Sequence, residues 1–335
     1  MHTIHHGKGP LRSTQHFLHA NPTLIPVIIL LISVLVFGFL AGSRFFSAFN
    51  LSLIMQQVAI IGILACAQTI VILTAGIDLS VAALMVLSSV VMSRLAVVSG
   101  LSPPLAIALG VGVAAGLGFV NGLFVTRLRL PAFIVTLGTW NIFFALAIWY
   151  SGAQSIRSQD IDRATPLLKF FGERVPVGDA VFTYGVFLML ALFVVLWFVL
   201  ERTAWGRHVY AVGDNKEAAE RAGIHTDRLL LSVYALAGFI CGIAAWASIG
   251  RVGSVSPQSF YEANLDSITA VVIGGTSLFG GRGSILGALF GALIVGVFSS
   301  GLKIAGLDIL WQRVAIGCLI ILAVALDRWI RKVSA

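Results

Sequence analysis

The stretch that decides the fold is residues 181–200, VFTYGVFLMLALFVVLWFVL, which contains no charged residue. Residues 24–40, LIPVIILLISVLVFGFL, form a second run of the same kind. Each run has about the length that an α-helix needs to cross the hydrocarbon core of a bilayer. The strands of a membrane barrel would instead alternate apolar and polar residues over about ten positions. Because lipid offers no hydrogen bonds to the backbone, unbroken apolar runs predict membrane-spanning helices.

The composition supports a membrane protein. Hydrophobic residues make up 58% of the chain and charged residues 11%, whereas soluble domains carry roughly 25% charged residues. The net charge of +8 would suggest a nucleic-acid partner in a soluble protein, but here it indicates basic loops on the cytoplasmic side and no nucleic acid. The three cysteines all lie within apolar runs, which excludes a disulfide framework and gives no metal site.

Apolar runs between polar or Gly/Pro breaks predict an all-α, polytopic membrane protein of about ten transmembrane helices. The first run is longer than a signal-peptide core, so we expect it to be retained as a span. The eighth and ninth runs are short and rich in glycine, which predicts bent helices or half-helices. The predicted spans are 24–41, 53–74, 81–98, 103–125, 131–150, 181–200, 229–249, 265–279, 284–301 and 311–326.

The distribution of Lys and Arg predicts the orientation. More of them fall in the loops that face the cytoplasm if the N-terminus is inside than in the loops on the other side. An even number of spans then places both termini, a tail over 1–23 and a tail over 327–335, in the cytoplasm. The transmembrane domain covers 24–326, with its longest polar stretches at 151–180 outside and 201–228 inside.

Two segments in different halves of the chain resemble each other in composition. An apolar run ends in Thr74–Ser80, TAGIDLS, and another ends in Gly274–Gly281, GGTSLFGG. A similarity of composition at this offset suggests an inverted repeat, a common plan among transporters.

Several chemical motifs are absent from the sequence. There is no GxxxxGK[ST] loop to hold ATP, and no HExxH, CxxC or GxSxG motif. We therefore expect no catalytic residue, no metal and no cofactor bound by this chain.

The most informative polar stretch is Gly206–Asp227, GRHVYAVGDNKEAAERAGIHTD. Asp214 and Glu217 have the spacing of a capping box, which predicts a short helix over Lys216–Ala222. Gly223 is a typical residue for the end of such a helix. An exposed, capped helix between two spans fits the groove of a partner protein, although an ordinary surface helix would show the same pattern.

Three segments resemble one family. Gly213–Ile224 (GDNKEAAERAGI), Leu73–Ser80 (LTAGIDLS) and Val272–Ser284 (VIGGTSLFGGRGS) are similar to segments of ribose-type permeases, the membrane subunits of bacterial ABC monosaccharide importers. The resemblance covers residues from about 24 to 330. Gly138–Asn141 (GTWN) and Ser158–Ile161 (SQDI) resemble the fructose-type members more closely.

The resemblance implies a permease that moves a pentose or hexose, with fructose favoured by the finer match, across the bacterial inner membrane. It also implies a second permease copy, a cytoplasmic ATPase that binds ATP and Mg, and a periplasmic sugar-binding protein. The residues that would couple the permease to the ATPase are Gly213, Asp214, Asn215, Glu217, Ala218, Ala219, Arg221 and Gly223. Among them, Glu217, Ala218 and Ala219 would lie in the groove of the ATPase. One departure from the family pattern is Ala82, where glycine is usual.

A sugar pathway needs hydrogen-bonding groups and an aromatic face. For each candidate the alternative role is to hold helices together, since polar side chains within spans often do so. Asp78 has a further alternative, as the N-cap of the third span. The candidates are Asp78, Ser80, Gln57, Gln68, Asn121, Thr139, Trp140, Asn141, Asn264 and Asp266.

Other functions remain open on sequence. A branched-chain amino acid ABC permease has the same sequence shape. An ion-coupled secondary transporter would need acidic groups deep in the bilayer, for which Asp78 and Asp266 are the candidates. An intramembrane enzyme is disfavoured because the catalytic motifs are missing.

Overall fold

The computed structural model describes residues 23–308, 310–312, 314–318, 321–322 and 325. The tails predicted over 1–23 and 327–335 lie outside the described residues, apart from Thr23. The span predicted over 311–326 lies partly outside them as well.

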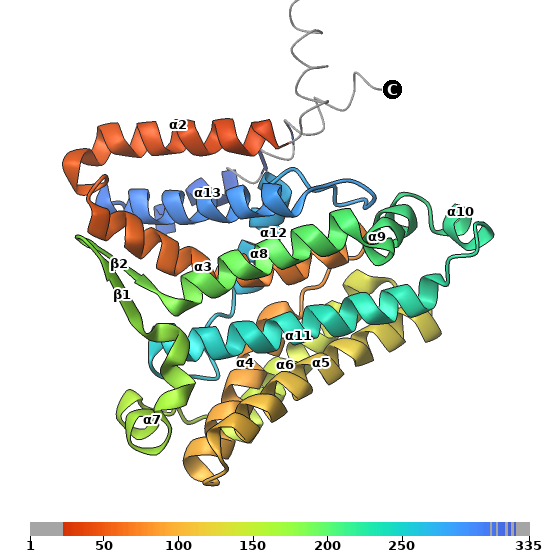
Figure 1. The fold of residues 1–335 in the computed structure, drawn as a ribbon, viewed down its shortest axis with the longest axis horizontal. Coiled ribbons are helices and arrows are strands. Elements are labelled where there is room, and N and C mark those ends of the chain that lie inside the picture. Colours follow the sequence, from red (N-terminus) through yellow and green to blue (C-terminus); the bar gives the residue numbers. More distant parts are fainter. Residues whose placement is uncertain (1–22, 309, 313, 319–320, 323–324, 326–335) are drawn as a thin grey trace, which may run out of the picture.

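Eight helices in the described part of the chain are long and apolar enough to cross a membrane, as expected for a polytopic protein. Their central residues match the predicted spans, and their ends differ by a few residues. Most of them run between the two ends of the molecule (Figure 1). They are α2 (Leu24–Ala41) with η1 (Gly42–Arg44), α3 (Ala48–Leu73), α4 (Val81–Ser93) with the π-helical η2 (Arg94–Val98), α5 (Pro103–Arg127), α6 (Ala132–Ser151), α8 (Tyr184–Arg202), α11 (Thr226–Val252) and α13 (Ile285–Ile304).

The predicted span at 265–279 is a half-helix. Helix α12 covers only Ala263–Ile273, which at 1.5 Å per residue is about 17 Å long. This confirms the expectation for the eighth run. The same expectation is wrong for the ninth run, because α13 is a helix of 20 residues, long enough to cross the membrane. Residues 274–284 then lead into α13 without regular structure across most of their length.

One end of the bundle carries α7 (Ser158–Ala164), η3 (Pro166–Gly172) and a two-stranded antiparallel sheet of β1 (Arg174–Val177) and β2 (Ala180–Thr183). The helix predicted to begin at residue 181 begins instead at Tyr184, and this short sheet is an addition to a mostly helical fold. The side chains of Ser52 and Gln56 on α3 bond the backbone of Val181, at 3.0 and 2.5 Å. These contacts hold residues 181–183 in the sheet, and α8 begins at Tyr184.

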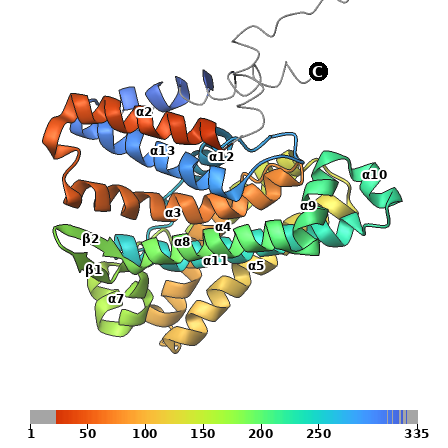
Figure 2. The same ribbon diagram turned by 45° about the horizontal axis from the view of Figure 1, so that its top comes forward.

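The opposite end carries two helices between α8 and α11. These are α9 (Ala204–Asp214), which the sequence analysis did not predict, and α10 (Lys216–Arg221). Figures 1 and 2 both place α10 at the far end of the molecule from the β1–β2 sheet. The two long polar stretches therefore lie at opposite ends of the helical bundle.

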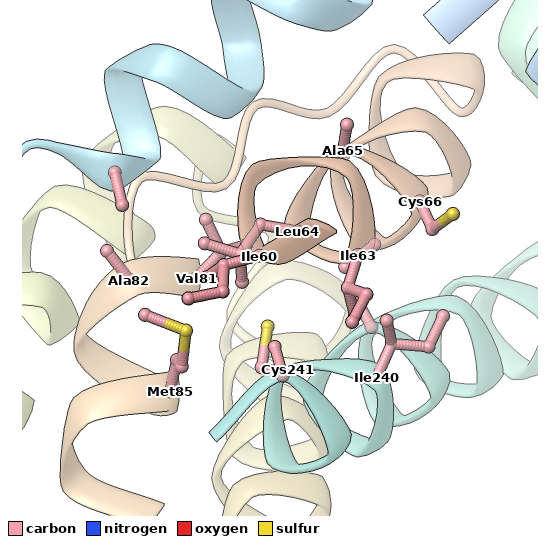
Figure 3. Close-up of a cluster of buried hydrophobic side chains, with 14 of the residues drawn as sticks. Ile60, Ile63, Leu64, Ala65, Cys66, Val81, Ala82, Met85, Ile240 and Cys241 are labelled. Atoms are coloured by element: carbon pink, nitrogen blue, oxygen red, sulfur yellow. The ribbon is translucent and has the colours of Figure 1, made fainter. Parts of the chain in front are cut away.

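The core lies where α3, α4 and α11 meet (Figure 3). Ile63 and Leu64 on α3, Met85 on α4 and Cys241 on α11 are completely buried. Van der Waals packing of this kind, rather than exclusion of water, holds helices together within a bilayer.

Candidate functional site

Three segments that the sequence analysis singled out meet at one point. The amide of Gly281 donates a 3.0 Å hydrogen bond to the carbonyl oxygen of Leu73. A Cβ atom built on Gly213 would overlap that same oxygen and would lie 2.6 Å from the Gly281 nitrogen. A Cβ on Gly280 would lie 2.7 Å from both the Ala75 nitrogen and the Gly213 oxygen. We call this the backbone junction: residues 73–75, 213–214 and 280–281.

The junction joins three segments without intervening side chains. Residues 73–75 end α3, residues 213–214 end α9 just before α10, and residues 280–281 lie between α12 and α13. Main-chain contacts of this kind leave no flexible side chain between the segments. The junction therefore connects the start of α10 to the two places where the membrane helices are interrupted.

Tyr210 on α9 adds a side-chain contact to the junction. Its hydroxyl donates to the carbonyl oxygen of Gly283 at 3.1 Å. Burial, with a smaller contribution from the charge of Glu201, raises the pKa of Tyr210 to about 12. The phenol is therefore protonated at neutral pH and keeps its donor.

The N-cap of α10 is Asn215. Its backbone is extended, and its side-chain oxygen accepts from the Ala218 amide at 2.9 Å. The predicted capping box of Asp214 and Glu217 is wrong, because Asp214 is the last residue of α9 and the cap lies one residue later. Asn satisfies a free helix donor as well as Asp does, so the pattern alone could not choose between the neighbours.

The predicted end of α10 at Gly223 is confirmed. Gly223 has φ of +86°, in the left-handed region that suits glycine. Its amide bonds to the Glu220 oxygen at 2.9 Å, and the Ile224 amide bonds to the Ala219 oxygen at 3.0 Å. These bonds satisfy carbonyl groups at the helix end.

Helix α10 presents one face outward and packs the other against its own chain. Ala219 is 5% exposed, whereas Glu217, Ala218 and Arg221 are exposed. The hydroxyl of Thr226 at the start of α11 donates to Glu220 at 2.5 Å. Ala219 therefore packs against its own chain, so the expectation that it lies in the groove of the ATPase is wrong for this residue. The outward face of α10 is the part that a partner could contact.

A buried polar cluster occupies the break between α3 and α4. One carboxylate oxygen of Asp78 accepts from both the amide and the hydroxyl of Ser80, at 2.7 and 2.6 Å. The Asn121 side chain donates to that hydroxyl at 2.8 Å, and the Asn264 side chain donates to the Leu79 oxygen at 3.1 Å. The structure therefore brings four of the predicted pathway residues together, as a cluster that fastens α5 and α12 to the break.

The alternative role predicted for Asp78, as an N-cap, is not what the structure shows. The N-cap position of α4 is Ser80, whose side chain makes no capping bond. Asp78 bonds to Ser80 instead, one step before the helix begins.

A cavity of about 750 Å³ opens on the side of the bundle that carries the β1–β2 sheet. It includes two of the predicted pathway residues, Gln57 and Asp266. Acidic and basic side chains surround it together with aromatic ones, a combination able to bind a hydroxyl-rich molecule. The polar and aromatic residues that line it are Gln57, Arg251, Phe260, Tyr261, Glu262, Asp266, Ser299 and Lys303.

Trp140 lies behind this cavity. Its ring centroid is 4.8 Å from that of Tyr261, and Phe144 is 4.9 Å from Tyr261 on the same side. Three rings from α6 and the segment before α12 thus support one aromatic wall.

The other predicted pathway residues lie elsewhere. Gln68 and Thr139 are buried among helices, and Asn141 is exposed on α6 with its amide bonded to the Leu137 oxygen. Two further lining residues, Arg251 and Lys303, were not predicted from the sequence. Their position at the ends of apolar runs was the available signal.

Comparison with known proteins gives consistent matches along the chain. Residues 50–324 match the family described as branched-chain amino acid transport system, permease component. The chain is 57% identical to the fructose import permease protein of Rhizobium meliloti, over 98% of this chain and 92% of that protein. It is 39% identical to the ribose import permease protein of Bacillus subtilis, over 93% and 95%, and 37% identical to the D-allose transport system permease protein of Escherichia coli, over 91% of each. No solved structure matches it.

Proposed function

The chain belongs to the permease-component family of bacterial ABC importers, and from this premise we propose that it carries fructose or a closely related monosaccharide across the membrane. It is a transport component of a monosaccharide importer and not an enzyme. The identity of 57% with a fructose import permease over nearly the whole chain is the observation that carries the choice of fructose. The ribose and allose permeases are more distant relatives.

The chain has no ATP-binding motif of its own, so we propose that it works with three partners. A cytoplasmic ATPase supplies the energy, a periplasmic binding protein delivers the sugar, and a second permease copy completes the membrane part. The exposed face of α10, with Glu217, Ala218 and Arg221, supports the ATPase contact. Asn215, Ala219 and Gly223 cap and seat that helix, Asp214 ends α9 just before it, and Gly213 connects it to the backbone junction.

The proposed orientation puts α10 and both termini in the cytoplasm. The excess of Lys and Arg in the loops at that end supports it. The cavity near the β1–β2 sheet then opens toward the periplasm, where the binding protein would release sugar.

Closure of the ATPase would move α10, and the backbone junction would pass this movement to the breaks at 74–80 and 274–284. Such a change shifts the protein between two arrangements of the same helices, biased by ATP binding. The pathway residues in this proposal are Gln57 and Asp266, with Trp140 supporting the wall. Asp78, Ser80, Asn121 and Asn264 hold the break in place.

The test is uptake of labelled fructose, ribose and allose by cells that express this chain together with its ATPase and binding protein. We expect fructose uptake that requires all three proteins. Uptake of ribose but not fructose would contradict the assignment of fructose as the substrate. Uptake by the reconstituted chain alone, driven by a proton or sodium gradient, would contradict the importer assignment.

A further inference from the structure

A second cavity, of about 490 Å³, lies beside the backbone junction. It is bounded by Thr74–Gly76, by the loop between α5 and α6, and by Gly213, Lys216 and Tyr234. Nothing in the proposed transport route uses it, since the sugar cavity opens at the other end of the bundle. Its size is within the usual range for small-molecule sites.

The charged groups at this cavity are all basic. Arg129 and Lys216 line it, and no acidic residue does so among the described residues. The Nζ atom of Lys216 forms ion pairs with carboxylate oxygens of Asp227 at 3.5 Å and Glu220 at 4.0 Å, and both acidic residues lie outside the cavity. Arg129 makes no ion pair within the described part of the chain. Arg129 therefore gives the cavity a positive charge that no acidic residue in the described part of the chain balances.

The inner wall of the cavity holds a polar group without a partner. Tyr234 is 1% exposed, and its hydroxyl has no hydrogen-bond partner among the described residues. A Cβ atom built on the buried Gly76 would lie 2.9 Å from that hydroxyl, so the hydroxyl lies behind Gly76. Tyr234 therefore contributes to the wall of the cavity, and its hydroxyl does not face a molecule bound there.

The remaining walls are apolar. Val125, Leu130, Pro131, Val212 and Leu230 surround the basic groups. This combination suits a molecule with an anionic group at one end and an apolar or sugar-like body. Basic pockets between membrane helices on the cytoplasmic side are known to bind phosphate headgroups.

We propose that this cavity binds a phosphate ester, with its anionic oxygens at Arg129 and Lys216 and its body against Tyr234. The phosphate comes either from an anionic lipid of the cytoplasmic leaflet or from a soluble sugar phosphate. Only the assignment of this end to the cytoplasm rests on the proposed function. Because the ligand touches both Thr74–Gly76 and Gly213, its presence would restrain the backbone junction and slow the transport cycle.

The test uses the purified permease alone, so it does not depend on transport. Fructose 6-phosphate is the soluble probe, measured by equilibrium dialysis. Phosphatidylglycerol is the lipid probe, measured by native mass spectrometry against phosphatidylcholine. Binding of the first probe identifies a soluble ligand, and preferential binding of the second identifies a lipid.

Three variants locate the site. Arg129→Gln should weaken binding at least about tenfold, as expected for loss of a charge-assisted hydrogen bond. Tyr234→Phe should leave binding nearly unchanged, because the hydroxyl that it removes lies behind Gly76. Arg127→Gln is the matched control, because Arg127 is exposed two residues away and lines a different cavity. The proposal is overturned if neither probe binds, or if Arg129→Gln and Arg127→Gln bind equally.

Discussion

The carbonyl oxygen of Leu73 occupies the space that a side chain at Gly213 would need. Leu73 ends a membrane helix, and Gly213 lies just before the short helix that we assign to the ATPase contact. Glycine at 213 lets two backbones touch directly. The same oxygen accepts a hydrogen bond from the amide of Gly281, so two distant segments of the chain contact this one oxygen of Leu73.

The first prediction concerns this contact. Gly213→Ala should lower fructose uptake at least about tenfold, because the new methyl group must push the junction apart and overpacking costs about 1–3 kcal/mol. Gly112→Ala is the control, since a Cβ there meets nothing within 4 Å. Uptake and membrane abundance should be measured together. Normal uptake by a well-inserted Gly213→Ala variant would show that the junction does not transmit movement.

The second prediction tests the ATPase contact. Glu217→Arg should reduce the amount of ATPase that copurifies with the permease at least about tenfold. The reason is that the reversed charge would repel the complementary charge on the ATPase surface. Glu173→Arg, at the opposite end of the molecule, should leave copurification unchanged. Equal loss in both variants, or in neither, would remove α10 from the interface.

The third prediction distinguishes the two neighbouring cap candidates. Asn215→Ala should destabilise α10 by about 1 kcal/mol and speed amide exchange over residues 218–222 about fivefold. Asp214→Ala should leave that exchange nearly unchanged, because Asp214 makes no capping bond to α10. Hydrogen–deuterium exchange of the detergent-solubilised protein measures both. Faster exchange in Asp214→Ala alone would restore the capping box that the structure replaces.

The fourth prediction concerns the polar cluster. Asp78→Ala leaves the amide and hydroxyl of Ser80 without their acceptor and should cost about 1–3 kcal/mol. Asp78→Asn keeps an acceptor oxygen and removes a buried charge, so its stability should stay within about 1 kcal/mol of the parent protein. Thermal unfolding in detergent compares them. If Asn destabilises as much as Ala does, the carboxylate charge itself is needed.

The fifth prediction concerns the sugar cavity. Gln57→Ala removes a polar group from its lining and should slow uptake about three- to tenfold, in line with about 0.5–1.5 kcal/mol for one hydrogen bond. Asn141→Ala serves as the control, because Asn141 is exposed on α6 and does not line the cavity. A larger effect at Asn141 than at Gln57 would place the pathway elsewhere.

The sequence alone was enough to determine the eight long spans of the described residues and the exposed helix at Lys216–Arg221. Length and apolar character decide which segments cross a bilayer, and both are local properties. The end of that helix at Gly223 was equally predictable, since a left-handed residue strongly favours glycine.

Only the tertiary structure decided how these parts meet. The strand at residues 181–183 depends on Ser52 and Gln56 from α3. The separation of Gln57 and Asp266 from Asp78, Ser80, Asn121 and Asn264 depends on which helices pack together. Polar residues within spans look alike in sequence whether they line a cavity or hold helices together, because both roles need the same hydrogen-bonding groups. The contact of Gly213 with Leu73 and Gly281 joins residues far apart in the chain, and no local pattern encodes such a contact.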